Sequence, residues 1–248
     1  MYNFFVEIES KQDNSFLIKG SDYNHIINVL RFKKGEEFIV TCNGISNLCS
    51  LEGFSNDTAF AKILVEDYQN TELPIKIHLF QGLPKSDKLE LIIQKAVELG
   101  VYEIIPTSMQ RCIVKIDDKK KNSKTERYNS ISESAAKQSK RNVIPKVLDV
   151  FSYKNALEYA KTLDLLLVPY ECENGMKKTK TALSEIKKGM SVGIIIGSEG
   201  GFDEKEIKLA QELPNARVIS LGKRILRTET AAISTISTLM MHAELNLE

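Results

Sequence analysis

The stretch "IIIGSEGGFDEKEI", residues 194–207, decides how the second half of the chain folds. In it, an apolar run enters a bend with three glycines, Gly197, Gly200 and Gly201, and an acidic helix start follows. This order predicts a buried strand, a glycine-rich loop and a helix, the repeating unit of a parallel sheet. Because ligands of open α/β sheets bind beyond the carboxyl ends of strands, we expect a binding site at this loop.

The loop does not have the features of a phosphate-binding loop. Its glycines have the wrong spacing for GxGxxG, and it lacks the lysine and hydroxyl of GxxxxGK[ST]. Glu199 and the acids of the following helix would repel a phosphate, so a neutral or cationic ligand fits better. A purely structural interpretation also stays open, with a tight turn at Gly200 and Gly201 and a cap pair formed by Asp203 and Glu206.

On both sides of this loop, residues 73–248 alternate between strand and helix patterns. The strands at 163–169 and 191–197 are apolar without alternation, which is expected when helices cover both faces of a sheet. We therefore predict an α/β domain with a largely parallel sheet. The expected strands are 75–83, 102–107, 145–150, 163–169, 191–197 and 216–222, and the expected helices are 87–99, 125–141, 153–161, 179–188, 203–212 and 228–244.

The first 72 residues have a different pattern, with short alternating strands separated by turn pairs such as Asn43-Gly44 and Asn56-Asp57. One amphipathic helix over 21–32 interrupts them. This pattern predicts a small β-barrel with one helix. We place the domain boundary near Leu73-Pro74, so that the domains are 1–72 and 73–248.

Composition is that of an ordinary globular protein, with 42% hydrophobic and 27% charged residues in 248. No apolar run has the length of a membrane span, and no basic leader precedes an apolar region, so we expect neither a membrane nor an export route. The four cysteines have no CxxC spacing and no histidines beside them, which favours reduced cytosolic thiols over a metal site or disulfides. They are Cys42, Cys49, Cys112 and Cys172.

The net charge of +1 conceals an asymmetry along the chain. Residues 1–72 carry 6 basic and 11 acidic side chains, a net of −5, whereas residues 111–146 carry 11 basic and 4 acidic, a net of +7. A polyanion partner along one surface is therefore plausible. A solvated, lysine-rich loop explains the same charges, and "DDKKKNSK" (117–124) has that composition.

Taken together, five segments of the sequence resemble one family. The loop "IIIGSEGGFDEKEI" and the later "VISLGKRILRTETAAISTIS" (218–237) resemble the C-terminal signature of SPOUT methyltransferases. Among these, the chain is most similar to the 16S ribosomal RNA uridine-N3 methyltransferase family (small-subunit methyltransferase E). The other supporting segments are "HIINVLRFKKGE" (25–36), "PKSDKLELIIQKAVELGVYEIIP" (84–106) and "ESAAKQSKRNVIPKV" (133–147).

This resemblance implies a SPOUT α/β domain with a deep trefoil knot, preceded by a small PUA-like β-barrel for RNA. It also implies S-adenosylmethionine as cofactor, a homodimer, and methylation of a uridine N3 in 16S ribosomal RNA of the small subunit, in the cytoplasm. Two alternatives remain: another RNA target such as a transfer RNA ribose 2′-OH, and a non-catalytic RNA-binding assembly factor. The chain departs from the family at Ser198 and Lys223, where proline is usual. The net charge of −5 on the barrel argues against it as the main RNA-binding surface and favours the basic segment 111–146.

The resemblance also implies site residues. Arg227 and Glu199 are the candidate catalytic residues. Arg227 would stabilise the negative charge on the deprotonated uracil, because arginine is a permanent cation with a planar donor fork. The alternative is an ion pair of Arg227 with Glu199 or Glu229.

The cofactor-binding candidates are Val168, Pro169, Gly197, Ser198, Gly200, Leu221, Gly222, Ile225, Leu226, Thr230 and Ala231, with core packing as the alternative for Ile225 and Leu226. The candidates for RNA contact are His25, Arg31, Arg111, Gln138 and Arg141, with a solvated surface as the alternative. No metal ligands are expected.

Overall fold

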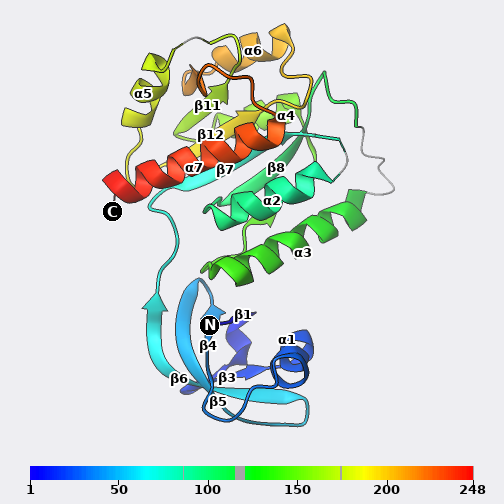
Figure 1. The fold of residues 1–248 in the computed structure, drawn as a ribbon, viewed down its shortest axis with the longest axis vertical. Helices are drawn as coiled ribbons and strands as arrows, with labels where there is room; N and C mark the ends of the chain where they lie inside the picture. The colour runs from blue at the N-terminus through cyan, green and yellow to red at the C-terminus, as the bar shows by residue number, and fades with distance from the viewer. Residues whose placement is uncertain (86, 115–120, 174, 248) are drawn as a thin grey trace. The chain divides into compact units, whose positions relative to one another are not determined.

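A computed structural model of the protein describes residues 1–85, 87–114, 121–173 and 175–247 (Figure 1). The chain divides into two compact units. The first consists of Met1–Glu72 together with Ala136–Ile144, and the second of Leu73–Ala135 together with Pro145–Glu248.

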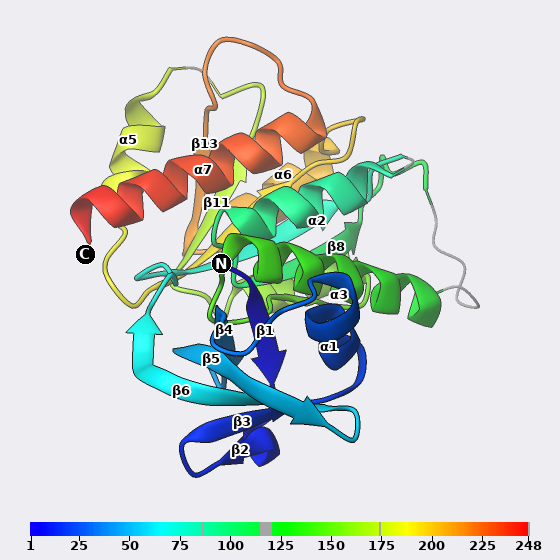
Figure 2. The same cartoon turned by 60° about the horizontal axis from the view of Figure 1, so that its bottom comes forward.

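The first unit is built on a six-stranded sheet in the order β1-β4-β5-β6-β3-β2 (Figure 2). The pairing of β1 with β4 is parallel, and the other pairs are antiparallel. The strands are β1 (Asn3–Val6), β2 (Lys11–Gln12), β3 (Ser15–Ile18), β4 (Glu37–Cys42), β5 (Ile45–Ser55) and β6 (Thr58–Gln69). The expected series of short strands is thus confirmed.

The core of the first unit lies under this sheet and includes Phe4, Phe16, Ile26 and Phe38, which are at most 1% exposed. Ile26 belongs to the helical segment between β3 and β4. That segment is a short helix α1 (Gly20–Asn24) followed by a π-helical turn (His25–Val29), so it ends before the expected residue 32. Arg31 then adopts a left-handed φ of 57°, which ends the helix.

Residues 136–144 pack within the first unit, although they lie in the second half of the chain. The Arg141 guanidinium donates to both carboxylate oxygens of Glu72, with an Nε–Oε1 distance of 2.8 Å. The Asn142 amide donates to the carbonyls of Gly44 and Gln69. The two-segment division 1–72 and 73–248 expected from sequence does not include this return of the chain. Contacts between residues about 70 positions apart leave no local pattern.

The second unit has a parallel sheet in the order β10-β8-β7-β12-β11-β13, and β9 also pairs with β8. Every pair in it is parallel. The strands are β7 (Lys76–Gly82), β8 (Glu103–Ser108), β9 (Lys146–Val147), β10 (Phe151–Ser152), β11 (Leu165–Pro169), β12 (Ser191–Ile196) and β13 (Ala216–Ile219). The expected strand 145–150 was wrong, because residues 148–150 separate β9 from β10.

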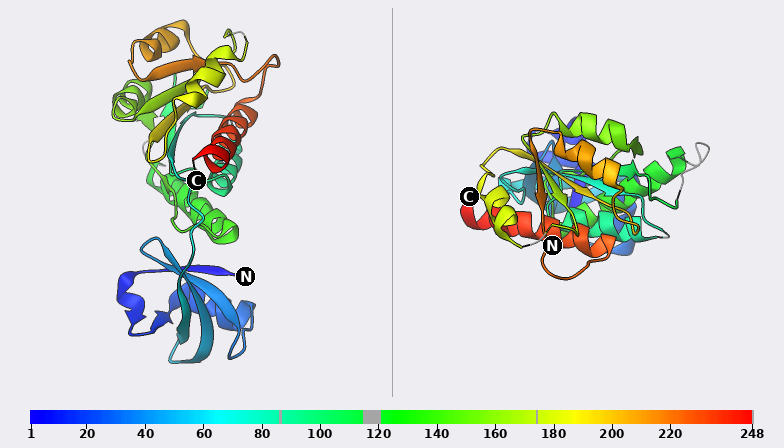
Figure 3. Two further views of the ribbon diagram at one scale, coloured as in Figure 1. Left: turned by 90° about the vertical axis from the view of Figure 1, so that its left-hand side faces the viewer. Right: turned by 90° about the horizontal axis from the view of Figure 1, so that it is seen from above.

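Helices cover both faces of the parallel sheet (Figure 3). On one face, α2 and α7 pack against each other. On the other, α4 and α6 share a core cluster with Ile195 of β12, whose neighbours Ile194 and Ile196 point the opposite way. The helices are α2 (Lys88–Glu98), α3 (Lys121–Ser139), α4 (Tyr153–Ala160), α5 (Lys177–Ser184), α6 (Glu204–Gln211) and α7 (Thr228–Asn246). The α/β prediction is confirmed, and the knot stays a prediction.

Among the residues that the structure describes, no helix is both long enough and apolar enough to cross a membrane. Of the basic segment 111–146, residues 115–120 lie outside the described part of the chain, including the first half of "DDKKKNSK".

Candidate active site

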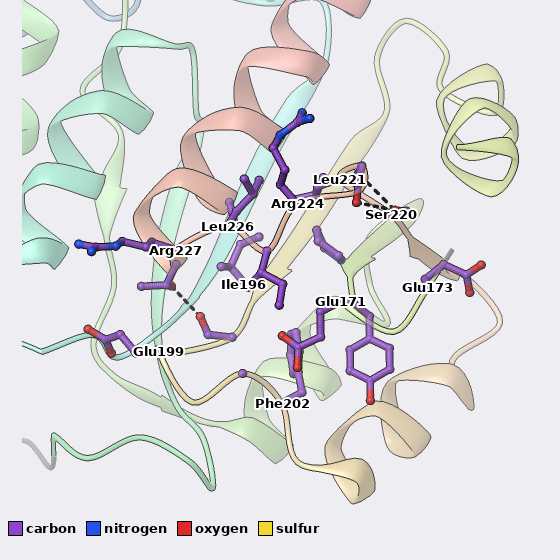
Figure 4. A pocket seen from close by; sticks show the side chains of 18 of the residues that line it. Glu171, Glu173, Ile196, Glu199, Phe202, Ser220, Leu221, Arg224, Leu226 and Arg227 are labelled. Carbon is purple, nitrogen blue, oxygen red and sulfur yellow. Dashed lines mark hydrogen bonds between the residues drawn. The ribbon is translucent and has the colours of Figure 1, made fainter. Parts of the chain in front are cut away.

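A pocket of about 930 Å³ lies at the carboxyl ends of β11, β12 and β13 (Figure 4). Three chain segments, one after each strand, form most of it, as the switch-point rule for open sheets leads one to expect, and Lys88 of α2 and Ala231 of α7 also line it. We call residues 196–202 the inner wall and residues 221–227 the outer wall. The third segment follows β11 and contributes Tyr170, Glu171 and Glu173 among others.

The inner wall is held closely by its neighbours. A Cβ atom added at Gly82, the last residue of β7, would lie 2.6 Å from the Ser198 nitrogen, so only glycine fits there. The Gly197 carbonyl accepts a hydrogen bond of 2.6 Å from the Thr228 hydroxyl, and that hydroxyl accepts one of 2.9 Å from the Gln81 amide. The Arg111 guanidinium donates to the Gly200 carbonyl at 3.2 Å. These bonds fix the wall's backbone.

The turn within the inner wall leads directly into α6. The Gly201 nitrogen donates to the Ser198 carbonyl, and Gly201 has a left-handed φ of 67°. Asp203 and Glu206 then form a capping box, which confirms the cap pair expected from sequence. Glu206 also accepts a hydrogen bond from the Gln110 nitrogen at 2.8 Å, so its carboxylate joins the helix start to the segment after β8.

Glu199 is paired with a lysine that the sequence analysis did not single out. Its carboxylate accepts a hydrogen bond from the Lys85 nitrogen at 3.0 Å and an ion pair from Lys88 Nζ at 3.1 Å. Burial acts to raise the pKa of Glu199, but these donors outweigh it and hold that pKa below its usual range. Lys88 Nζ also lies 3.4 Å from Glu229, and its pKa is raised, chiefly by Glu199.

The alternative interpretation, an ion pair of Arg227 with Glu199 or Glu229, was therefore wrong, because Lys88 lies between the two carboxylates. Arg227 is exposed at the N-cap of α7 and forms no ion pair with any residue in the described ranges. Its guanidinium lies at the pocket's rim, on the same side as Glu199 (Figure 4).

The outer wall is more loosely held than the inner one. It is anchored at its start, where the Thr179 hydroxyl donates to the Ser220 carbonyl at 2.8 Å, and at its end, where α7 begins. Between these points, Ile225 is 88% exposed. Core packing was the alternative for Ile225 and Leu226, and it was wrong for Ile225. Leu226 is half-buried.

Eight of the eleven cofactor-binding candidates line the pocket, as do both catalytic candidates, Arg227 and Glu199. The eight are Pro169, Gly197, Ser198, Leu221, Gly222, Ile225, Leu226 and Ala231. The other three lie outside the lining. Val168 is fully buried in the core cluster with α4 and α6, Gly200 faces Arg111, and Thr230 is exposed on α7.

The candidates for RNA contact have different surroundings. Arg141 was expected on an RNA-facing surface, and this was wrong: it is 3% exposed and engaged by Glu72. Arg111 is exposed but bound to the Gly200 carbonyl, with its other amino group 3.9 Å from Asp203. In the first unit, Arg31 and Gln138 are exposed, and His25 is half-buried in edge contacts with Tyr2 and Phe4.

The lining suits S-adenosylmethionine. Ile196, Phe202 and Leu226 offer apolar surface for a flat aromatic ring. Backbone groups at Leu221 and Gly222 are open, since a Cβ at Gly222 would meet nothing within 4 Å. Glu171 adds a carboxylate that suits a cation. The pocket lacks the phosphate-binding features whose absence was already evident in the sequence.

Sequence reasoning missed several residues of the lining, of which Lys88, Glu171 and Ser220 matter most. Glu171 and Ser220 follow closely after the ends of β11 and β13. For them, the position one or two residues beyond a strand end was a usable signal. Lys88 had no such signal, because its partners are 111 and 141 positions away in the chain.

Comparisons with known proteins agree with this architecture. A profile of the RNA methyltransferase domain family matches residues 71–240, and one of the RNA methyltransferase PUA domain matches residues 18–64. The chain is 38% identical to ribosomal RNA small subunit methyltransferase E of Bacillus subtilis, over 99% of this chain and 98% of the relative.

Solved structures give the same result. The structure of a ribosomal RNA small subunit methyltransferase E from Neisseria gonorrhoeae, bound to S-adenosylmethionine, has a TM-score of 0.81 at 29% identity, covering 97% of each chain. A putative methyltransferase from Legionella pneumophila, in complex with the same cofactor, also has a TM-score of 0.81, at 30% identity and covering 96% of each chain. The chain, with its PUA and methyltransferase units and its pocket at three strand ends, belongs to the ribosomal RNA small subunit methyltransferase E family.

Proposed function

We propose that this protein transfers a methyl group from S-adenosylmethionine to N3 of a uridine in the 16S ribosomal RNA of the small subunit. The observation that carries this proposal is the pocket at the ends of β11, β12 and β13, with apolar walls and a carboxylate, in a chain of this family. A ribosomal substrate implies a cytoplasmic location.

The bound cofactor would supply an electrophilic methyl group on a sulfonium centre. Uracil N3 would lose its proton to solvent water and take the methyl group, and the cofactor would leave as the neutral thioether. Arg227 stabilises the negative charge that develops on the uracil oxygens. It is suited to this role because it lies exposed at the pocket rim and has no ion-pair partner among the described residues.

Glu199 acts in this proposal as a residue that holds the inner wall, and it is not the general base. Its pKa is held below the usual range by the donors around it, and a carboxylate with a lowered pKa is a weaker proton acceptor. Among the described residues that line the pocket, there is no histidine that could act as the general base.

The proposed homodimer rests on apolar surface that the described residues leave uncovered on the face of α2 and α7. Leu91 of α2 and Met241 and Leu245 of α7 are between 44% and 73% exposed. Exposed large aliphatic side chains on neighbouring helices are typical of protein interfaces. Light scattering on the purified protein should give twice the mass of the 28.0 kDa chain.

The decisive experiment incubates the protein with unmodified small subunits and cofactor labelled in the methyl group, followed by nuclease digestion and nucleoside analysis. We expect labelled 3-methyluridine from the small-subunit RNA. Labelled 2′-O-methylribose would overturn the uridine-N3 assignment, and absence of cofactor binding in calorimetry would overturn the enzyme assignment altogether.

The role of Arg227 is tested by Arg227→Ala. Removing one donor to a developing oxyanion costs about 100- to 1000-fold in turnover, so we expect a loss of that order. Cofactor affinity should change by less than about threefold, because the side chain points away from the pocket centre (Figure 4). The matched variant Arg227→Lys keeps the charge without the planar fork and should recover only part of the loss. Equal losses of affinity and turnover would assign Arg227 to cofactor binding instead.

A further inference from the structure

Three carboxylates line the pocket, and two of them are already paired within the protein. Glu199 is bound by Lys88 and the Lys85 nitrogen, and Glu173 forms an ion pair of 2.7 Å with Lys178. Glu171 is different: among the residues that the structure describes, it has no hydrogen bond and no ion pair. Its negative charge is therefore available to a ligand.

The side chain of Glu171 is directed into the pocket. Figure 4 shows it on the side of Ile196 and Phe202, facing the inner wall. A Cβ atom added at Gly201 would lie 3.6 Å from both carboxylate oxygens, so the carboxylate lies close to the inner wall. Because apolar side chains flank this position, water screens the charge less than it would on an open surface.

The four cations of the described lining do not neutralise Glu171, and Lys223 forms no ion pair with any described residue. Lys88 is engaged by Glu199 and Glu229. Figure 4 shows the guanidinium groups of Arg224 and Arg227 directed away from the pocket centre. A positively charged group bound in the centre would therefore find Glu171 as its nearest unpaired counter-charge.

We propose that Glu171 recognises the sulfonium charge of the cofactor and so distinguishes the charged methyl donor from the neutral thioether that remains after transfer. This inference rests on the proposed function, since it assumes that S-adenosylmethionine occupies the pocket. The resemblance to the family made Glu199 a candidate catalytic residue. Because Lys88 already pairs with Glu199, Glu171 is the carboxylate that remains available to the positive charge of the cofactor.

The proposal has a consequence for turnover. Before transfer, Glu171 faces a cation, and the Coulomb attraction adds to cofactor affinity. When the methyl group leaves with the positive charge of the sulfonium, this attraction is lost, so Glu171 no longer adds to the affinity for the ligand. The same side chain thus favours entry of the donor and departure of the spent product.

Isothermal titration calorimetry on the full-length protein tests this, with S-adenosylmethionine and S-adenosylhomocysteine as the two titrants. The two ligands share their adenosine and amino acid parts and differ by the methyl group and its charge. Glu171→Gln keeps the size and the hydrogen-bond acceptor of the side chain but removes its charge. We expect the variant to bind S-adenosylmethionine about tenfold more weakly, and S-adenosylhomocysteine with less than about twofold change.

The control is Glu212→Gln, which removes the charge of an exposed carboxylate outside the pocket lining. It should leave the ratio of the two affinities unchanged. Thermal melting of both variants without ligand should match the wild type, because Glu171 is exposed and makes no contact that holds the fold.

The outcomes are distinguishable. If Glu171→Gln weakens both ligands equally, the carboxylate binds a part that they share, such as the ribose hydroxyls, and the proposal is wrong. If it changes neither, Glu171 does not face the ligand, and the proposal is also wrong. If the wild-type protein binds neither ligand, it is the proposed function that fails, whatever the variant does.

Discussion

The inner wall of the pocket contacts three other segments of the second unit, whereas the outer wall is anchored only at its ends. Gly82, Thr228 and Arg111 hold the inner wall by close approach and hydrogen bonds. The middle of the outer wall, residues 223–226, makes no comparable hydrogen bonds with the described residues, and Ile225 is 88% exposed.

This difference indicates a division of roles between the walls. A site that binds a reactive cofactor gains from groups fixed before the ligand arrives, because no free energy is then spent on ordering them. The inner wall has that property. The outer wall carries the exposed Ile225 and Arg227, and a segment with few internal contacts can adjust to a bound cofactor and to RNA.

Of the substitutions that test the difference between the two walls, Gly82→Ala should have the largest effect. The new Cβ would meet the Ser198 nitrogen at 2.6 Å and the Gly197 carbonyl carbon at 2.9 Å. Both are backbone atoms, so the inner wall has to move. Overpacking of this kind costs about 1–3 kcal/mol, and we expect that loss in the free energy of unfolding. Cofactor affinity should fall with it. Urea unfolding and calorimetry measure the two effects.

Gly53→Ala is the matched control, because a Cβ at Gly53 meets nothing within 4 Å and its φ is not left-handed. It should change the free energy of unfolding by less than about 0.5 kcal/mol. If Gly82→Ala were equally silent, the inner wall would be free to shift and the contrast between the walls would disappear.

Most of what the sequence predicted correctly depends on local pattern. The parallel sheet, the helices around it and the capping box of Asp203 and Glu206 follow from periodicity and from spacings of three residues. The strand ends then place the binding loops, and eight of the eleven cofactor candidates line the pocket. Each of these features depends on residues that lie within a few positions of one another in the chain, which is why a single sequence reveals them.

The errors concern side chains whose partners are distant in the chain. An ion pair of Arg227 with Glu199 or Glu229 was the alternative left open from the sequence, but Lys88 at the start of α2 pairs with both carboxylates. Arg141 was placed on an RNA-facing surface, but Glu72 buries it. In both cases an arginine side chain is compatible with an ion pair inside the protein and with contact to RNA or substrate. Only the path of the chain in space decides which opposite charge is near.

A substitution in the outer wall should have a smaller effect than Gly82→Ala. Ile225→Ser removes an aliphatic side chain that is 88% exposed, so the free energy of unfolding should change by less than about 0.5 kcal/mol. If the side chain packs on the cofactor, cofactor affinity should fall about three- to tenfold, the equivalent of burying part of an isoleucine. Calorimetry and thermal melting separate the two. A marked loss of stability without loss of affinity would make Ile225 part of the fold.

The smallest expected effect concerns the contribution of Glu199, in the inner wall, to the pH dependence of the free energy of unfolding. Its pKa is lowered in the folded state, since Lys85 and Lys88 outweigh burial, so the folded protein binds fewer protons at this site than the unfolded chain does. The corresponding stabilisation is complete above the ordinary carboxyl pKa of about 4.3 and is lost as pH falls through the lowered value. Lys88 titrates only in the alkaline range, because its pKa is raised from 10.5, so it keeps its charge throughout this window.

Glu199→Gln cannot titrate, so its free energy of unfolding should fall less steeply than that of the wild type as pH is lowered from 5 to about 3. Urea unfolding at several pH values in this window measures the slope. Glu212→Gln, which replaces an exposed carboxylate without an ion pair among the described residues, should leave the slope as in the wild type. If Glu199→Gln and Glu212→Gln gave the same slope, Lys85 and Lys88 would contribute nothing to holding Glu199. The inner wall would then depend on Gly82, Thr228 and Arg111 alone.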